Sequence, residues 1–326
     1  MSKEPKRKTS ILFIGHIAID NVIKNKIEFN PTLGGSVCFC SLALNTYTSH
    51  VTIGVLSKLG KNNFPPSLLK RLNSSGINLE GIIQIDSDNT NFVLDYSNNY
   101  RKLTLKSRSP DIHFEDMPKR YLENKPDAIV LVPICNEISF EFVRKIHKTF
   151  PNACIGIDLQ GFVRTIDKEG NVLLDSNGEK KKIILKIIEL LGDRLICKGS
   201  KKEMQYVSGK REMKEIMNFY RKFEGISIMT LGKDGSLITQ KDHEIIEIPA
   251  YRPEISIDET GAGDVYLSIF IYEYLKSTKE WDTIKKIGKL AASAASFLIE
   301  EKGVAGFKPK KIIKKRIKRK NYYFLN

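Results

Sequence analysis

The chain has 326 residues, of which 41% are hydrophobic and 28% are charged, and its formal net charge is +15. This composition is typical of a globular protein with enough apolar material for a core, and it excludes a chain that is disordered throughout. At about 150 residues per domain, the length allows two units, or one large domain with a small appendage.

The distribution of apolar residues predicts a cytoplasmic protein without a membrane partner. No run of about 18 apolar residues occurs that could span a membrane. The basic segment at 1–10 leads straight into the apolar ILFIGHIAID, with no signal-cleavage site between them. The five cysteines lie mostly inside apolar runs, as reduced thiols do, so we expect neither a disulfide nor a zinc site.

Strand and helix patterns alternate in the first part of the chain. SILFIGHIAIDNVI at 10–23 predicts a buried strand that is broken at Gly15 and followed by a second strand. PTLGGSVCFCSLALNTY at 31–47 predicts a turn that leads into an apolar helix. A strand at 51–60 and a helix at 65–76 follow. This alternation is typical of a parallel α/β sheet.

The texture changes between residues 77 and 108. Short apolar stretches alternate with polar residues there and are separated by the turns SDN and SNN, which predicts antiparallel strands with one solvated face. Together with the strands near 10–30, this segment is expected to form a small β-sheet lid over a ligand crevice. An exposed sheet face of this kind would allow a homodimer through the lid.

The α/β alternation resumes at Asp127 and continues to about residue 303. We therefore predict one large α/β domain with a mostly parallel sheet. The expected strands lie at 127–134, 153–160, 193–199 and, as a strand, turn and strand, at 226–240; the expected helices lie at 139–150, 181–192, 201–223, from about 261, and at 281–303.

Much of the positive charge lies near the C-terminus, within a basic segment at 308–326. KPKKIIKKRIKRK holds nine basic residues and no acidic one. Ile312, Ile313 and Ile317 recur at helical spacing, which predicts a helix that docks on the core and exposes a basic face. Such a helix could bind nucleic acid, but no aromatic residues or base-reading motif accompany the charge, so nucleic acid is a disfavoured partner.

The stretch DETGAGDVYL at 258–267 is the strongest candidate site. A dinucleotide loop would need glycine where Tyr266 stands, and the chain contains no P-loop pattern. A helix that begins with small residues exposes backbone amides at its positive end, which makes an anion site. Plain capping by Asp258 or Asp264 is the alternative, but capping does not require two glycines. A carboxylate beside an anion site suits a hydroxyl that loses its proton while it attacks a phosphoryl group.

DETGAGDVYL resembles the D-x-T-G-A-G-D signature of the PfkB, or ribokinase-like, carbohydrate kinases. The resemblance implies that Asp264 is the catalytic base and that Gly261, Ala262 and Gly263 form the anion hole. It also implies a three-layer α/β/α domain over residues 10–326, with a mostly parallel central sheet and a small β-sheet lid. ATP and Mg²⁺ are the implied cofactors. The carbonyls of Asp258 and Thr260 are expected to hold a monovalent cation such as K⁺, as in several relatives.

Other segments resemble the family in the same order. LGGSVCFCSLAL contains the paired Gly34 and Gly35 that approach the acceptor, and Asp20 matches the acidic residue that holds acceptor hydroxyls. On the donor side, TLGKDG supplies Thr230, Gly232 and Gly235 for the nucleotide phosphates. Glu203 fits the N-x-x-E glutamate that acts on magnesium through water, with Ser200 in the place of asparagine. The glycine pair, TLGKDG and Glu203 also have simpler explanations as an ordinary turn, a hairpin and a solvated helix residue.

Two departures from the family pattern bear on the acceptor. Phe39 stands where ribokinases proper place an asparagine, which disfavours ribose. DLQGFVR at 158–164 replaces the usual D-x-N-x-R and is similar to the archaeal and plant kinases of myo-inositol. Gln160 and Arg164 are then expected at the acceptor or the transferring phosphate. An ion pair of Arg164 with Asp167 or Glu169 is the alternative.

The acceptor class stays open among three kinds of molecule. A cyclic polyol calls for carboxylates and amides, which Asp20, Gln160 and Asn91 would supply. The resemblance favours myo-inositol. A phosphosugar would use the basic residues Arg101, Lys102 and Arg108, and a nucleoside would stack on Phe39 and Phe92. A nucleic-acid-associated protein that uses the basic segment is the rival from another class.

Overall fold

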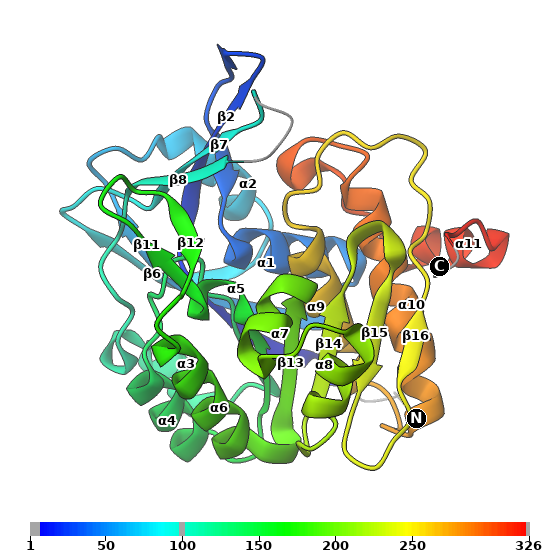
Figure 1. Ribbon diagram of the computed structural model, residues 1–326. Helices are drawn as coiled ribbons and strands as arrows, with labels where there is room; N and C mark the ends of the chain where they lie inside the picture. The colour runs from blue at the N-terminus through cyan, green and yellow to red at the C-terminus, as the bar shows by residue number, and fades with distance from the viewer. Residues whose placement is uncertain (1–6, 98–101, 324–326) are drawn as a thin grey trace, which may run out of the picture.

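The computed structural model describes residues 7–97 and 102–323. Within them, a nine-stranded sheet has the order β16-β15-β14-β13-β10-β9-β1-β5-β6 (Figure 1). The strands from β14 to β6 pair in parallel, whereas β15 and β16 pair antiparallel at one edge. In chain order the strands are β1 (Thr9–Ile14), β5 (Val51–Gly60), β6 (Asn78–Ile85), β9 (Ala128–Leu131), β10 (Cys154–Asp158), β13 (Leu195–Ser200), β14 (Ile226–Thr230), β15 (Ser236–Thr239) and β16 (Ile246–Ile248).

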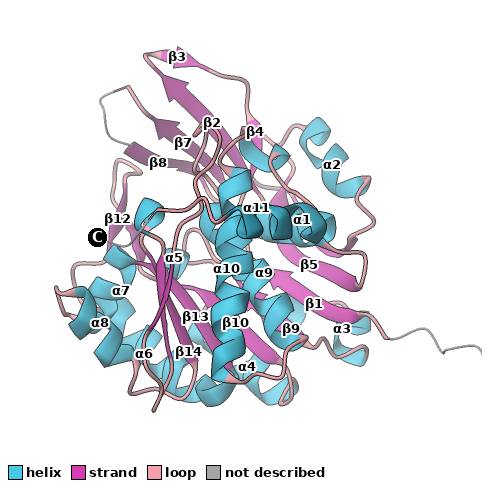
Figure 2. Cartoon of the chain, turned by 90° about the vertical axis from the view of Figure 1, so that its right-hand side faces the viewer, coloured by secondary structure: helices cyan, strands magenta, loops and turns pink. Residues whose placement is uncertain are grey.

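Helices cover both faces of this sheet, so the predicted three-layer arrangement is confirmed (Figure 2). Side chains alternate along each strand: Ile11 and Phe13 enter one apolar cluster, while Leu12 and Ile14 enter the other. Strands that are buried on both faces read as continuous apolar runs. The first cluster includes α1 (Ser36–Tyr47), α2 (Lys70–Asn73), α9 (Ala262–Leu275), α10 (Trp281–Leu298) and α11 (Lys310–Arg319); the second includes α3 (Lys119–Glu123), α4 (Phe140–Thr149), α5 (Leu159–Phe162), α6 (Glu179–Leu191), α7 (Lys201–Ser208) and α8 (Met213–Tyr220).

A second, small sheet rises from the carboxyl-end side of the large one, at the top of Figure 1. Its order is β3-β2-β7-β8, and β4 also pairs with β2. The pair β2 and β7 is parallel and the other pairs are antiparallel, so the prediction of a purely antiparallel lid was wrong in that pair. The strands are β2 (Ala18–Lys24), β3 (Ile27–Glu28), β4 (Thr32–Gly34), β7 (Asn91–Asp95) and β8 (Lys102–Ser107).

The predicted bounds of the lid were too wide, because residues 10–14 and 78–85 belong to the large sheet. β1 is buried on both faces and pairs with β5 and β9. β6 pairs in parallel with β5 and forms the edge of the large sheet. An edge strand is partly solvated, so its polar alternation resembled that of a lid strand.

The segment after β10 contains a hairpin that the sequence pattern did not predict. β11 (Arg164–Ile166) and β12 (Val172–Leu174) pair antiparallel around a turn at Gly170. The hairpin contacts the small sheet, because the amide of Leu105 donates to the carbonyl of Gly170 at 2.8 Å. A three-residue strand offers too short an alternation to be recognised.

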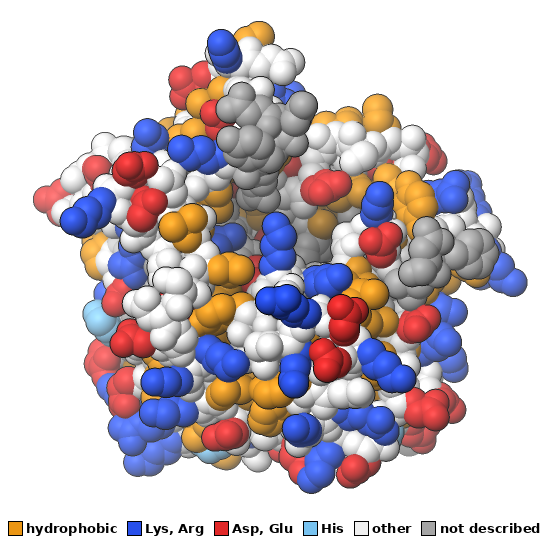
Figure 3. Space-filling view, in the orientation of Figure 1, with side chains coloured by type: hydrophobic (Ala, Val, Ile, Leu, Met, Phe, Trp, Pro, Cys, Tyr) orange, Lys and Arg blue, Asp and Glu red, His pale blue; other side chains and the backbone are white. Residues whose placement is uncertain are grey.

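The basic segment forms α11, as its spacing predicts. Ile313 is buried, Ile312 and Ile317 pack against the core, and Arg316 donates hydrogen bonds to Ser296 and Glu300 of the α10 region. Over the face shown in Figure 3, Lys and Arg side chains are interspersed with Asp and Glu instead of gathering in one patch.

The cellular location and the homodimer are the two further predictions. None of the helices in the described ranges has the length and apolar character needed to cross a bilayer. Ile27 and Phe29 are exposed at the tip of the small sheet. The cytoplasmic location and the homodimer through the lid stay predictions.

Candidate active site

Three neighbouring strands of the large sheet end with polar residues at the same edge. Asp158 at the end of β10 pairs in register with Lys198 of β13, and Ser200 of β13 pairs with Thr230 of β14. Helix α9 begins beside them. The carboxyl ends of parallel strands are the usual position of ligand crevices in open α/β sheets.

The start of α9 requires glycine at two positions. Gly261 has φ +82°, and a Cβ atom on it would lie 2.1 Å from the ring of Phe39. A Cβ atom on Gly263 would lie 2.5 Å from Nζ of Lys198. In the described part of the chain no acceptor is found for the amides of Gly261 and Gly263, whereas the amide of Ala262 donates to the carbonyl of Glu259 at 3.3 Å. Two of the three expected anion-hole amides are therefore available, and that of Ala262 is engaged.

Asp264 lies in the first turn of α9 and is 7% exposed. Its Oδ1 atom is buried and has no hydrogen-bond partner among the described residues. Burial raises the pKa of this carboxyl to about 7, and the nearby charge of Asp158 acts in the same direction, while Lys198 opposes the rise. A carboxylate whose pKa lies near neutrality is suited to accept a proton in a general-base step.

Lys198 forms a buried ion pair with Asp158 next to Gly263, at the start of α9. The distance from Nζ to Oδ2 is 2.7 Å, and the side chains are 5% and 0% exposed. Burial opposes the charge of the ammonium, but Asp158, Asp264 and Glu203 outweigh it, so the pKa of Lys198 is raised and the group stays charged. The sequence pattern placed this lysine only within a strand and missed its position in the site.

A cavity of about 180 Å³ lies between the start of α9, the end of β10 and the small sheet. Gly34 lies just behind it, because a Cβ atom there would be 2.3 Å from the carboxylate of Asp20. Among the residues that line the cavity are these predicted ones: Asp20, Gly35, Gln160, Arg164, Thr260, Gly261, Gly263 and Asp264. Phe39 and Phe92, considered for a nucleoside, also line the cavity. The sequence did not indicate the remaining lining residues, which are Ser36, Leu94, Leu103, Ile134 and Glu259.

Asn91 is not among the residues that line the cavity, and its contact with the acceptor stays a prediction. Its side-chain oxygen accepts a hydrogen bond from Nδ2 of Asn21 at 2.6 Å. Side chains on a strand alternate between its faces, and Phe92 and Leu94 of β7 face the cavity instead.

Gln160 and Arg164 lie side by side in the cavity wall. With its carboxamide oxygen turned toward the guanidinium, Gln160 accepts hydrogen bonds from Arg164 at 3.2 and 3.3 Å. Arg164 also donates to the carbonyl of Ile134 at 2.7 Å. Of the two loop carboxylates expected as alternative partners of Arg164, Asp167 accepts hydrogen bonds from the amides of Glu169 and Asn171, and Glu169 accepts from Nδ2 of Asn171 at 3.1 Å.

The predicted donor-side residues lie at the same sheet edge, outside this cavity. Ser200 and Glu203 form a capping box on α7: the Ser200 amide donates to Oε2 of Glu203 at 2.7 Å, and the Glu203 amide donates to the Ser200 hydroxyl at 3.4 Å. The turn after Thr230 requires glycine at Gly232 and Gly235, whose φ angles are +62° and +89°. Glu203 thus has a structural role in addition to any role toward a metal.

Asp258 braces the loop that precedes α9. Its carboxylate accepts hydrogen bonds from the amide of Thr260 at 3.0 Å and from that of Gly303 at 3.2 Å. The side chain of Asp258 is therefore occupied in the loop, and a cation would have to use backbone carbonyls.

Residues 9–311 match the family model described as pfkB family carbohydrate kinase. The chain belongs to this family. The sugar and nucleoside kinases of this family are ATP-dependent phosphotransferases that use a divalent metal, and the family predicted from the sequence motifs is confirmed.

Individual relatives differ in the acceptors that their names state. A nucleoside kinase of Methanocaldococcus jannaschii is 39% identical over 89 residues, which are 27% of this chain and 28% of that protein. A nucleoside kinase of Methanothermobacter thermautotrophicus likewise aligns over only 23% of its own length. An ATP-dependent 6-phosphofructokinase of Thermoanaerobacterium thermosaccharolyticum is 23% identical over 310 residues, 91% of this chain and 90% of that protein.

The solved structures confirm the ribokinase-like fold. A pyrophosphate-dependent kinase in the ribokinase family, complexed with a pyrophosphate analogue and myo-inositol, superimposes with a TM-score of 0.72 at 18% identity. The match covers 94% of this chain and 99% of that one. At this identity the likeness establishes the fold and leaves the acceptor open.

Proposed function

We propose that this chain phosphorylates a hydroxyl of a small, unphosphorylated cyclic polyol or sugar, with ATP as the donor and myo-inositol as the first candidate acceptor. The observation that carries the proposal is Asp264, a buried carboxylate whose pKa is raised to about 7. It faces a cavity that also holds the polar side chains of Asp20, Gln160 and Arg164.

In the proposed reaction the acceptor oxygen attacks the γ-phosphorus of ATP in line with the leaving oxygen of ADP. The bond from oxygen to phosphorus forms, the bond from phosphorus to ADP breaks, and the hydroxyl proton moves to Asp264. The amides of Gly261 and Gly263 donate to the oxygens on which negative charge develops. The small sheet closes the cavity and excludes water, so that ATP is not hydrolysed.

The residues around the donor side fit a metal-bound nucleotide. Thr230, Gly232 and Gly235 would lie along the phosphates, beside Ser200, and Glu203 would hold Mg²⁺ through water. The metal would supply positive charge to the phosphate oxygens. The carbonyls of Asp258 and Thr260 would hold a monovalent cation.

Replacing potassium by tetramethylammonium at constant ionic strength is expected to reduce the turnover number, because a bulky organic cation cannot enter a carbonyl site. Steady-state rates at saturating Mg²⁺ measure this effect, and sodium serves as an intermediate case. Equal turnover in potassium and tetramethylammonium would remove the cation from the proposal.

The size and lining of the cavity favour a single-ring acceptor. Its volume of about 180 Å³ is below the roughly 300–1,000 Å³ of pockets for drug-sized ligands. One side is polar, and the other is formed by Phe92, Leu94 and Leu103 of the small sheet together with Ile134. A cyclic polyol presents hydroxyls at its edge and C–H groups on its ring faces, so it matches both sides.

A phosphosugar is supported less well, because Lys102 and Arg108, the two described basic residues that would serve it, do not line the cavity. Lys102 is exposed on β8. Arg108 donates to the carbonyl of Cys135 at 3.0 Å and pairs with Asp111. Arg101 lies outside the described residues.

A nucleoside is the second candidate. Phe39 and Phe92 both line the cavity and offer aromatic surface to a base. Two archaeal relatives are named nucleoside kinases, although each aligns with only about a quarter of this chain.

A coupled assay of ADP formation tests the proposal. ATP is offered with myo-inositol, ribose, fructose, fructose 6-phosphate and a set of nucleosides. We expect the highest kcat/KM with myo-inositol, and the product is identified by mass and by phosphorus NMR. The highest kcat/KM with a nucleoside would replace myo-inositol by the second candidate, and turnover of none of these molecules would contradict the proposed acceptor class.

A further inference from the structure

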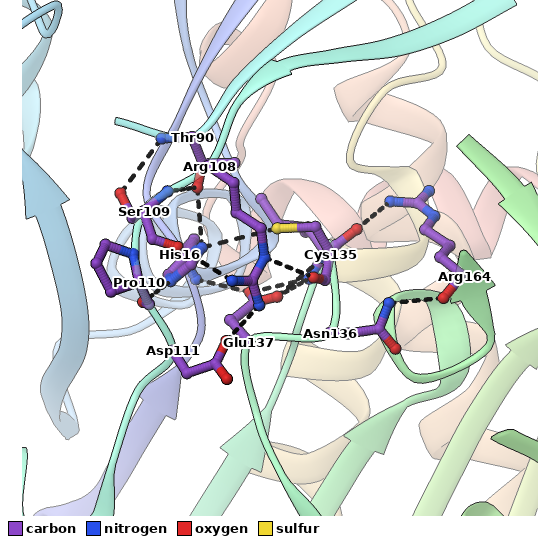
Figure 4. A network of polar contacts seen from close by, with 11 residues as sticks. His16, Thr90, Arg108, Ser109, Pro110, Asp111, Cys135, Asn136, Glu137 and Arg164 are labelled. Atoms are coloured by element: carbon purple, nitrogen blue, oxygen red, sulfur yellow. Dashed lines mark hydrogen bonds and ion pairs between the residues drawn. The ribbon is translucent and has the colours of Figure 1, made fainter. Parts of the chain in front are cut away.

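A buried polar cluster joins the small sheet to the acceptor side of the cavity (Figure 4). It is centred on the loop 134–137 that follows β9. His16 and Glu137 are 0% exposed and Cys135 is 2% exposed. Neither the catalytic residues nor the donor-side residues include any of them, so their burial needs a separate explanation.

The carboxylate of Glu137 accepts hydrogen bonds from backbone amides of two segments. Oε1 accepts from the amide of His16 at 3.0 Å and from that of Ile134 at 2.9 Å, and Oε2 accepts from the amide of Cys135 at 2.8 Å. Burial raises the pKa of this carboxyl, but the hydrogen bonds from the backbone amides oppose burial, and the pKa is lowered. The side chain thus stays ionised and binds the end of β1 to the loop after β9.

The imidazole of His16 extends these contacts to the base of the small sheet. Nε2 lies 3.0 Å from the carbonyl of Pro110, which can only accept, so Nε2 carries the proton. Nδ1 then accepts from the hydroxyl of Thr90 at 2.9 Å. The Thr90 hydroxyl also accepts from the amide of Ser109 at 3.0 Å. Thr90 immediately precedes β7 and Ser109 follows β8, so one histidine holds both ends of this hairpin.

The opposite end of the cluster contacts Arg164. Its guanidinium donates to the carbonyl of Ile134 at 2.7 Å, and Nδ2 of Asn136 donates to the carbonyl of Arg164 at 2.6 Å. Figure 4 shows the Asn136 side chain directed at the backbone carbonyl of Arg164 and the Arg164 guanidinium directed at the loop. Ile134 and Arg164 both line the cavity. The position of the Arg164 side chain therefore depends on the loop that Glu137 holds.

The same three side chains could be considered as a metal site, because ligand atoms of His16, Cys135 and Glu137 lie within 4.8 Å of one another. Their contacts argue against it. Both oxygens of Glu137 already accept from amides. Burial raises the pKa of the Cys135 thiol well above its ordinary value, which disfavours the thiolate that binds metals. The guanidinium of Arg108 also lies beside the cluster (Figure 4).

We propose that Glu137 is a positioning residue for the acceptor site: it holds the loop 134–137 so that Arg164 points into the cavity, and through His16 it fixes the base of the small sheet in the same arrangement. The inference rests on the proposed role of Arg164 toward the acceptor. It explains why a charged side chain is fully buried here although it does not line the cavity.

The variant Glu137→Gln tests this inference in the full-length protein. The NH₂ group of the glutamine must face at least one backbone N–H that donated a hydrogen bond to the carboxylate. Two donors cannot pair, so the loop has to shift. We expect KM for the preferred acceptor to rise by about 10–100-fold, the scale of a misplacement of about 1 Å, while KM for ATP stays within about twofold. Glu273→Gln is the matched control, because it removes another buried carboxylate at the far end of α9; it should lower the melting temperature and leave both KM values unchanged.

A double-mutant cycle separates positioning from general stability. If Glu137 acts through Arg164, Glu137→Gln has little further effect on acceptor KM in the Arg164→Ala background. Additive effects, or equal rises of the two KM values in Glu137→Gln, would overturn the inference. If Arg164→Ala itself leaves acceptor KM unchanged, the proposed role of Arg164 fails instead.

A second variant covers the case in which Glu137→Gln does not fold. Asn136 has φ +62°, so Asn136→Gly keeps the backbone conformation and removes only the bond to the carbonyl of Arg164. We expect a smaller rise of acceptor KM, with KM for ATP unchanged. An unchanged acceptor KM in this variant would contradict the proposed path through the loop.

Discussion

The variant Asp264→Asn is expected to lose about 10²–10⁴-fold or more of the phosphoryl-transfer rate while binding ATP as tightly as the wild type. The asparagine keeps the shape of the side chain in the first turn of α9 but cannot accept the hydroxyl proton. Steady-state kinetics with the preferred acceptor measure the loss, and calorimetry measures the affinity for ATP. Asp20→Asn, the other cavity carboxylate, is the control and should raise acceptor KM with a smaller effect on kcat. Near-normal turnover of Asp264→Asn would exclude this residue as the base.

The same group determines the pH dependence of the wild type. Because burial raises the pKa of Asp264 to about 7, the fraction of the basic form increases as pH rises through that value. We expect log kcat/KM to rise with pH below about 7 and to level off above it. A profile that is flat between pH 5.5 and 8 would contradict the assignment.

Removing the charge of Asp264 is expected to stabilise the folded protein at alkaline pH. The folded pKa is about 7 and the ordinary value is 3.8, so between these values the folded state keeps a proton that the unfolded state has released. The free energy of unfolding of the wild type therefore falls as pH rises through this window, by on the order of 4 kcal/mol in total. Asp264→Asn should melt at a higher temperature than the wild type at pH 8, and the difference should shrink toward pH 4.

The variant Lys198→Met is expected to have the second largest effect, because it leaves two buried carboxylates without their shared cation. Breaking a buried ion pair by removing one partner costs about 3–5 kcal/mol. Lys198 also lowers the pKa of Asp264, so without it that pKa should rise above about 7. We expect a lower melting temperature, a lower kcat/KM at pH 7, and a pH profile whose midpoint moves to alkaline values.

A matched variant separates the electrostatic effect from the loss of stability. Lys58 forms an ion pair with Asp116 at 2.9 Å, with side chains 11% and 19% exposed, away from the cavity. Lys58→Met should lower the melting temperature and leave the midpoint of the pH profile unchanged. If the two variants shift this midpoint equally, Lys198 does not act on Asp264.

The parallel core could be predicted from the sequence because strands buried on both faces appear as unbroken apolar runs. The small sheet was harder: β6 and β7 share the same polar alternation, and only the pairing of β6 with β5 assigns it to the large sheet. Pairing between distant segments depends on tertiary packing, which local patterns do not contain.

In the candidate site, too, some residues could be predicted from local patterns and others depend on pairing between distant segments. The glycines at the start of α9 and the carboxylate of Asp264 follow from one short motif, because their chemistry depends on neighbours in the chain. Lys198 offered one signal, a single lysine inside an apolar strand, but its partner Asp158 lies 40 positions away and meets it only through the register of β10 and β13. The sequence did not show that Phe92 and Leu94, and not Asn91, line the cavity, because the face of a strand cannot be assigned before its pairing is known.

The docking of α11 restricts how the basic charge of this protein can be altered. Lys310 pairs with Glu273 near the end of α9, and the guanidinium of Arg316 stacks on the ring of Phe297 in α10. The C-terminal segment thus anchors the far end of the helix whose first turn carries Asp264. Truncation before Lys310 would remove these contacts and lower the melting temperature, so charge is better removed by substituting exposed lysines such as Lys314 and Lys315 one by one.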